Sequence, residues 1–245
     1  MKFFIKRKNK NIEKAAFGSA LLMVSAFAVS IANPVKGFAA THSKEVKESP
    51  SDTLTARNVF ERLNSSALEI LPHTTRLDML DYWDVDSVYK ASNAMEGLSW
   101  LETVTRNYLK VRITAVSTLE IKILPAKKSN IIMTVHTIGD DVQAQDSGIK
   151  FYDENLNEIP ADKHLKMPEV KDFFDIPKGS ATSMKEIEDM IPFPTIAFSA
   201  NPENDNLEAR LTVEKYINED DWNIAKLFFK PAITASWHKE KFKFR

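Results

Sequence analysis

Alternating polar and apolar residues run through the middle of the chain. In YLKVRIT (108–114) and LEIKIL (119–124) every second residue is apolar, and NIIMTVHTI (130–138) and GIKFYD (148–153) continue the series. A period of two indicates strands that bury one face, and short polar connections between such strands are typical of an antiparallel meander. The pattern therefore predicts a first strand cluster over residues 108–153.

The residues before this cluster follow a helical spacing instead. A first helix is predicted after a cap at Ser51 or Asp52 and before the stop at 71–72, with one apolar face formed by Val59, Phe60, Leu63 and Ala67. A second short helix would bury Leu77, Leu80 and Val85. A third helical stretch is expected around 97–107.

Strand patterns return after a proline-rich region that holds a short helical patch at 183–191. TIAFSA (195–200) and NLEARLTV (206–213) read as a hairpin, the acidic start of 218–229 predicts a helix, and 233–244 reads as a closing strand. We predict an α+β fold in which N-terminal helices pack on a mostly antiparallel β-sheet. Residues 54–245 would form one domain, and the strand clusters 108–153 and 195–244 would be one sheet or two related halves.

The first 53 residues have a different composition. Residues 1–39 combine a basic start with the uncharged apolar run AAFGSALLMVSAFAVSIA (15–32), which is the layout of a cleavable secretory signal. Small residues at −1 and −3 place the cleavage after Ala39 or Ala32; a retained membrane anchor is the alternative, but we expect no stable membrane span after cleavage. Residues 40–53 are polar and read as a tether. These features predict export out of the cytoplasm, to the periplasm or cell envelope.

Charge is distributed unevenly between the leader and the body. Residues 1–39 hold seven of the 33 Lys/Arg and one of the 34 Asp/Glu, so the remainder carries 26 basic and 33 acidic residues, a net charge of −7. Nucleic-acid binding needs grouped Lys and Arg to neutralise phosphates. The body has no such group in its sequence, and we expect no nucleic-acid partner.

The sequence lacks the residues or spacings that several kinds of catalytic and cofactor site require. The chain has no cysteine, which excludes thiol catalysis, thiolate metal sites and disulfides. Its six glycines do not form GxGxxG or a P-loop, and its five histidines show no metal-ligand spacing such as HExxH. We therefore expect no cofactor and no metal, and we assign no catalytic residue.

The acidic segment TRLDMLDYWDVDS (74–87) is the first candidate surface site. Asp78 and Asp81 share one helical face, and Asp84 follows a turn later, with Arg76 able to pair with one of them. The spacing does not fit a calcium loop, because neither Asp81 nor Asp84 as first ligand brings glycine to the sixth position. An amphipathic helix with a solvated acidic side explains the pattern, and paired catalytic carboxylates are the alternative.

Trp222 and Trp237 complete the set of candidate surface residues. Trp222 follows the acidic start of a predicted helix, and Trp237 lies in the predicted closing strand beside polar residues. The chain's aromatic residues are expected mainly in the core, but either tryptophan could line a groove if it is exposed.

Four stretches, LPHTTRLDMLDYWD, STLEIKILP, GIKFYDENLNEI and ASWHKEKFKF, carry a family resemblance. Together they resemble DUF3256, a family of uncharacterised exported proteins of Bacteroidales, from about residue 55 to the C-terminus. The resemblance implies an exported protein of a Gram-negative gut-type bacterium. It implies no activity, ligand or catalytic residue.

Two hypotheses about function follow. The first is an exported, non-catalytic binding or protein-interaction module for an unknown protein or small-molecule ligand, because a sheet without a catalytic constellation can bind through a concave face or an edge strand. The alternative is a hydrolase that acts on an extracellular polymer and uses carboxylates such as Asp78, Asp81 or Asp84 as acid and base. The second hypothesis requires two carboxyl groups about 5–10 Å apart in one open cleft.

Overall fold

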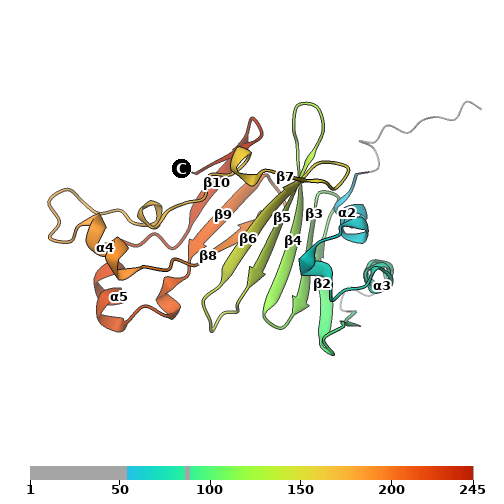
Figure 1. The fold of residues 1–245 in the computed structure, drawn as a ribbon, viewed down its shortest axis with the longest axis horizontal. Coiled ribbons are helices and arrows are strands. Elements are labelled where there is room, and N and C mark those ends of the chain that lie inside the picture. Colours follow the sequence, from blue (N-terminus) through green and yellow to red (C-terminus); the bar gives the residue numbers. More distant parts are fainter. Residues whose placement is uncertain (1–53, 86–88, 245) are drawn as a thin grey trace, which may run out of the picture. The chain divides into compact units, whose positions relative to one another are not determined.

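The computed structural model describes residues 54–85 and 89–244, all within one compact unit, Lys47–Arg245. The predicted signal (1–39) and tether (40–53) lie outside the described residues, as do Ser51 and Asp52. The described chain forms two antiparallel sheets, one of seven strands and one of four, with helices on the N-terminal side (Figure 1). The predicted α+β class is confirmed.

The seven-stranded sheet is a simple meander in which each strand pairs with the next along the chain. Its strands are β1 (Ala91–Ser92), β2 (Leu98–Val104), β3 (Tyr108–Thr114), β4 (Ser117–Leu124), β5 (Ile131–Ile138), β6 (Asp146–Tyr152) and β7 (Glu158–Ile159). Four of these, β3 to β6, match the alternating segments of the first predicted cluster. Both edge strands, β1 and β7, are only two residues long, which limits pairing with another chain.

The helix predicted around 97–107 is wrong, because this region forms strand β2. Its register against β3 shifts between Leu101 and Thr103 through a bulge. Because the bulge inserts one extra residue, Leu101 and Val104 pair with Val111 and Leu109 on the same face although they are three positions apart. A spacing of three is a helical signal in sequence, and here a bulged strand produces it.

Helices α2 (Ala56–Arg62) and α3 (His73–Trp83), with the 3-10 turn η1 (Ser66–Leu68) between them, cover one face of this sheet. The side chain of Thr55, not Ser51 or Asp52, caps α2 by accepting the Asn58 N–H. The first helix ends at Arg62, earlier than predicted. In the second helix Leu80 is buried as predicted, but Leu77 is only half-buried, Met79 is buried in its place, and Val85 is 86% exposed beyond the C-terminus. We call the sheet face under these helices the helix-side face.

The four-stranded sheet has the order β11-β10-β9-β8. Its strands are β8 (Ile196–Ala200), β9 (Asn206–Leu211), β10 (Ile233–His238) and β11 (Lys241–Phe244). The single closing strand predicted over 233–244 is therefore a hairpin. Lys239 and Glu240 adopt positive φ angles of 49° and 62° at its tip, a conformation that alternation alone does not reveal.

Short helical segments connect and flank this second sheet. They are η2 (Ala161–Lys163), η3 (Val170–Phe173), α4 (Met184–Met190), η4 (Val213–Lys215) and α5 (Glu219–Ala225). Helix α4 confirms the helical patch predicted at 183–191, and it begins at a capping box formed by Ser183 and Glu186. Helix α5 is shorter than the predicted 218–229, and Leu227 beyond it is 72% exposed.

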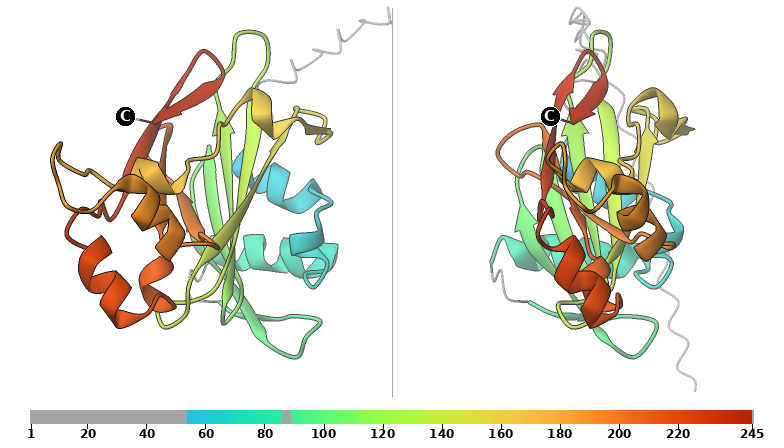
Figure 2. Two further views of the ribbon diagram at one scale, coloured as in Figure 1. Left: turned by 60° about the vertical axis from the view of Figure 1, so that its left-hand side comes forward. Right: turned by 90° about the vertical axis from the view of Figure 1, so that its left-hand side faces the viewer.

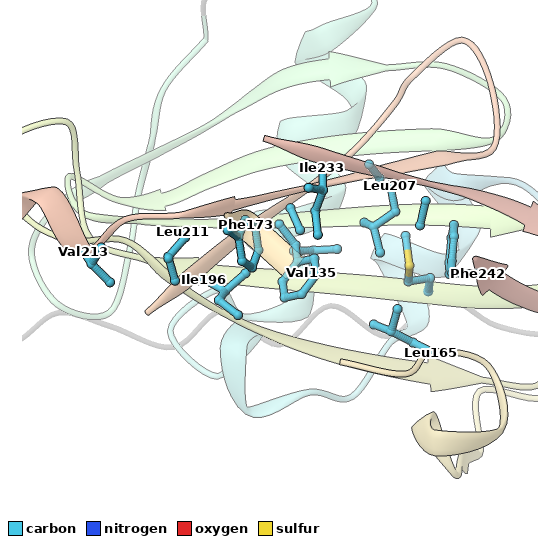
Figure 3. Close-up of a cluster of buried hydrophobic side chains, with 14 of the residues drawn as sticks. Val135, Leu165, Phe173, Ile196, Leu207, Leu211, Val213, Ile233 and Phe242 are labelled. Atoms are coloured by element: carbon cyan, nitrogen blue, oxygen red, sulfur yellow. The ribbon is translucent and has the colours of Figure 1, made fainter. Parts of the chain in front are cut away.

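The seven-stranded sheet separates two apolar cores. The helix-side core joins α2 and α3 to residues such as Leu109, Ile121 and Ile132. The second core lies against the opposite face, which we call the inner face, and joins Val135 to Phe173, Leu207 and Phe242, among others (Figure 3). The left view of Figure 2 shows the resulting order: helices α2 and α3, the large sheet, then the small sheet with α4 and α5.

Candidate functional site: a lysine-rimmed groove beside strand β11

Three aspartates of the acidic segment, Asp78, Asp81 and Asp84, are described by the structure, and all three are exposed. Asp78 and Asp81 are exposed on α3. Asp84 caps the C-terminal end of α3 and accepts two hydrogen bonds from Arg57, at 2.8 and 2.9 Å. This ion pair holds the pKa of the Asp84 carboxyl below its usual value. A catalytic acid needs the opposite shift, because it must stay protonated near neutral pH.

Arg76 ties the two N-terminal helices together rather than pairing with an aspartate. Its Nη1 donates to the carbonyl oxygens of Phe60 (2.6 Å) and Leu63 (2.9 Å), at the C-terminal end of α2. Burial lowers the pKa of its guanidinium. These contacts satisfy carbonyls that a helix end leaves without a partner, which is a structural role.

Both candidate tryptophans are half-buried and pack on aromatic neighbours. The ring of Trp222 meets Phe229 edge-on at 5.2 Å between centroids. Trp237 lies 4.8 Å from Phe242, and its indole N–H donates to the Pro125 carbonyl at 2.7 Å. Neither tryptophan lines the groove described next, but the Trp237 ring packs, tilted by 59°, against Phe242, which does.

That hollow is a groove of about 640 Å³ beside the edge strand β11. Three separate segments line it: residues 166–172, the start of β10, and β11 itself. Its lining is Lys166, Met167, Pro168, Lys171, Asp172, Lys230, Ile233, Phe242, Lys243 and Phe244. The volume lies within the range of about 300–1,000 Å³ that small-molecule sites occupy.

The floor of the groove is apolar and firmly held. Ile233 and Phe242 are 7% and 5% exposed and belong to the inner-face core, with Phe244 packed against it. The Phe242 N–H donates to the His164 carbonyl, and the Lys230 N–H donates to the Phe173 carbonyl, both at 2.8 Å. These bonds anchor two walls of the groove to the segments beneath them, so the site is preformed.

The rim of the groove carries an excess of positive charge. Lys171 and Lys166 share one carboxylate, Glu169, at 2.6 and 3.8 Å. Lys230 and Lys243 form no ion pair with any residue in 54–85 or 89–244. Asp172 is turned to the backbone, where its Oδ2 accepts the Glu169 N–H at 2.8 Å.

The sequence did not indicate this site because its lysines lie far apart along the chain. Lys166, Lys230 and Lys243 come from three segments that only the fold brings together. The four-lysine rim contrasts with the acidic body, in which no basic run occurs.

A second group of ionisable residues lies between the two sheets, where its central side chains, Glu120 and Lys122, are buried from solvent. Glu120 is 3% exposed, and burial raises the pKa of its carboxyl. Its Oε2 accepts the Ala200 N–H at 2.7 Å, its Oε1 accepts the Ser199 hydroxyl at 3.3 Å, and Lys110 lies 3.8 Å away. Lys122, two residues on, donates to the Asn201 carbonyl at 2.9 Å.

Together with the buried Ser147 and the exposed Asp146, Glu120 provides hydrogen-bond acceptors for the edge of β8. Asp146 Oδ1 accepts the Ile196 N–H at 3.1 Å, and Ser147 Oγ accepts the Phe198 N–H at 2.9 Å. With Glu120, these side chains satisfy every second N–H along a strand edge that has no neighbouring strand. Because the oxygens are occupied and Glu120 is buried, the cluster holds the two sheets together and offers no substrate access.

In residues 54–85 and 89–244, no three His, Cys, Asp or Glu side chains gather where they could hold a metal ion. Nor does that part of the chain include a helix of the length and apolarity that a membrane crossing requires.

Comparison with known proteins places the chain in a family. The model of the family described as "Protein of unknown function (DUF3256)" matches residues 50–242, and the chain belongs to this family. A solved structure, of a domain of an uncharacterized protein from Porphyromonas gingivalis W83, shares the fold with a TM-score of 0.66 at 23% identity. The match covers 77% of this chain and 96% of that one. No curated protein matches.

Proposed function

We propose that this member of the DUF3256 family is an exported, non-catalytic binding module whose ligand occupies the lysine-rimmed groove. The observation that carries the proposal is the lining of the groove: a preformed apolar floor with a few charged groups at its rim, the composition typical of small-molecule sites. Its ionisable side chains are four lysines and one aspartate, and that aspartate is engaged with the backbone. The groove therefore supports binding better than acid–base chemistry.

Export is supported by the basic leader and the apolar run within residues 1–39. Fractionation of the host cells followed by N-terminal sequencing tests it. The expected N-terminus is Ala40 or Asn33, in the periplasmic or envelope fraction. Recovery of the chain from the cytoplasm with its leader intact would contradict export and would leave the groove proposal untouched.

Binding is tested by backbone amide NMR of the purified protein against a library of neutral, cationic and anionic fragments. Shifts are expected to cluster in 166–172, 230–233 and 242–244. Met167→Trp puts a larger side chain over the groove and should reduce them, whereas Met95→Trp, at an exposed methionine outside its lining, should not. Responses confined to helix α3 (His73–Trp83) and its C-cap Asp84 would overturn the groove proposal and favour the hydrolase hypothesis.

A further inference from the structure

We infer that the ligand of the groove is an amphipathic anion: one small molecule with an acidic head group on a hydrocarbon body. This inference rests on the proposed function and names the chemical class that the site selects. It follows from two properties of the groove, a positively charged rim and an apolar floor. A purely polar ligand would leave the floor uncovered, and a neutral ligand would leave the charge of the rim without a partner.

The first property is the charge of the rim. Four lysines against Asp172 in the lining, with Glu169 beside it, leave an excess of two positive charges. Lys230 and Lys243 are the groups without a carboxylate partner in the described chain. A ligand anion would supply that partner, while a cationic ligand would meet repulsion. Lysine is a compact charge without a fixed fork, so the site accepts a carboxylate, sulfate or phosphate head group alike.

The second property is the apolar floor. Ile233, Phe242 and Phe244 line the groove directly beside the rim lysines. A hydrophilic anion such as acetate would leave this surface in water, whereas a hydrocarbon body would cover it and gain roughly 25 cal/mol for each Å² buried. Met167, which is 49% exposed, adds a flexible apolar side chain that can adapt to the shape of the ligand.

The recessed position of the floor favours a single molecule over a membrane surface. Phe242 is 5% exposed and Ile233 is 7% exposed, so neither can reach into a lipid layer from its place at the bottom of the groove. Proteins that bind an interface insert protruding apolar residues flanked by basic ones. Here the lysines are more exposed than Ile233 and Phe242, and Met167 is the one strongly exposed apolar side chain of the lining, so most of the apolar surface is recessed and suits a single bound molecule.

The test is isothermal titration of the purified protein with decanoate, kept below its critical micelle concentration. Decyltrimethylammonium, decanol and acetate are the comparison ligands. Decanoate is expected to bind at least about tenfold more tightly than each of them, because one charge-assisted contact is equivalent to about a tenfold change in affinity. The advantage over decanol should shrink as salt is added.

Two pairs of variants locate the contacts. Lys230→Gln combined with Lys243→Gln should weaken decanoate binding by about tenfold or more, while Lys241→Gln, on the same strand but outside the groove lining, should not. Phe244→Ala should weaken the binding of decanoate, while Phe193→Ala, at an exposed phenylalanine elsewhere, should not. Circular dichroism shows whether each variant is folded, and equal effects within a pair would overturn the assignment.

The outcomes separate this inference from the proposed function. Equal binding of decanol and decanoate in the groove would overturn the anionic class and leave a binding module. Binding to phosphatidylglycerol vesicles without binding of monomeric decanoate would overturn the single-molecule ligand. If fragments change the NMR shifts of the groove amides but no anionic amphiphile binds, the ligand class is wrong and the binding module stands. If neither fragments nor amphiphiles bind, the ligand class and the binding module are both wrong.

Discussion

The two faces of the seven-stranded sheet are covered in different ways. Helix α2 packs over β3 and β4, where the covered side chains are apolar, among them Leu109, Val111 and Ile121. The small sheet covers an inner face that includes Glu120, Lys122 and Ser147 between apolar residues. Both interfaces are buried, so burial alone does not explain the difference.

The difference arises from the backbone of the covering element. A helix satisfies its interior N–H groups itself, and only its ends need polar partners, so its buried side can be apolar. At the start of α2 the Ala56 N–H donates to the Arg106 carbonyl at 2.8 Å. An edge strand brings a row of unpaired N–H groups, and buried donors without acceptors are costly. Strand β8 brings those of Ile196, Phe198 and Ala200, and side chains of the large sheet accept all three. The same contacts close this edge to other strands.

The largest effect is expected on the helix side. Phe60→Ala removes a ring that is completely buried between α2 and the sheet, and should cost about 3–5 kcal/mol of unfolding free energy through lost burial and the remaining cavity. Urea denaturation measures it as a lower midpoint with an unchanged slope. Phe193→Ala, at a phenylalanine that is 79% exposed, is the control and should change the midpoint little.

The inner face should be sensitive to the loss of one acceptor. Glu120→Ala leaves the Ala200 N–H buried without a partner and removes the carboxylate beside Lys110, at an expected cost of about 3 kcal/mol. Glu120→Gln should cost less, because its amide oxygen can still accept from Ala200. An alanine variant as stable as the parent in urea denaturation would show that the β8 edge does not depend on this side chain.

The same residue predicts a dependence on pH. Burial raises the pKa of Glu120 above its ordinary value of 4.5, so the native state holds this proton more tightly than the unfolded chain. The contribution of Glu120 to stability is therefore fully present below pH 4.5 and falls as the pH rises through the raised value. The stability of the parent relative to Glu120→Gln should decline across that window. A flat difference would show that the pKa is not raised.

Carboxyl groups with a lowered pKa, such as Asp84, have the opposite effect, because they make the protein more stable as the pH rises. They are common to the parent and to Glu120→Gln, and therefore cancel when the two stabilities are subtracted. The difference between the two proteins, and not the pH profile of either one, is the quantity that reports on Glu120.

Much of the fold was predictable from the sequence, because apolar and polar residues alternate along strands such as β3 and β9, which bury one face more than the other. The alternation in STLEIKIL located β4 correctly but suggested a solvated polar side. Glu120 and Lys122 are instead buried under β8, since alternation records which residues share a face and not what covers it. Strand β2 was missed because its bulge imitates helical spacing.

The candidate site was less predictable than the fold. The acidic segment drew attention because its aspartates are adjacent in sequence, yet Asp78 and Asp81 are exposed and Asp84 is paired with Arg57. The groove depends on distant segments that meet beside β11, and no local pattern records that meeting. Trp237 was the nearest indication, through its contact with Phe242.

The smallest expected effects come from single hydroxyl groups, and they test whether burial sets the cost of an unpaired N–H. Ser147→Ala removes the acceptor of the Phe198 N–H inside the sheet interface and should cost about 2 kcal/mol. Thr55→Ala removes the cap of the Asn58 N–H, which lies at the exposed start of α2, and should cost about 1 kcal/mol because water can replace the hydroxyl. Urea denaturation of both variants gives the comparison directly. Equal losses would mean that a strand edge and a helix end impose the same requirement whether or not they are buried, and the polar inner face would then need another explanation.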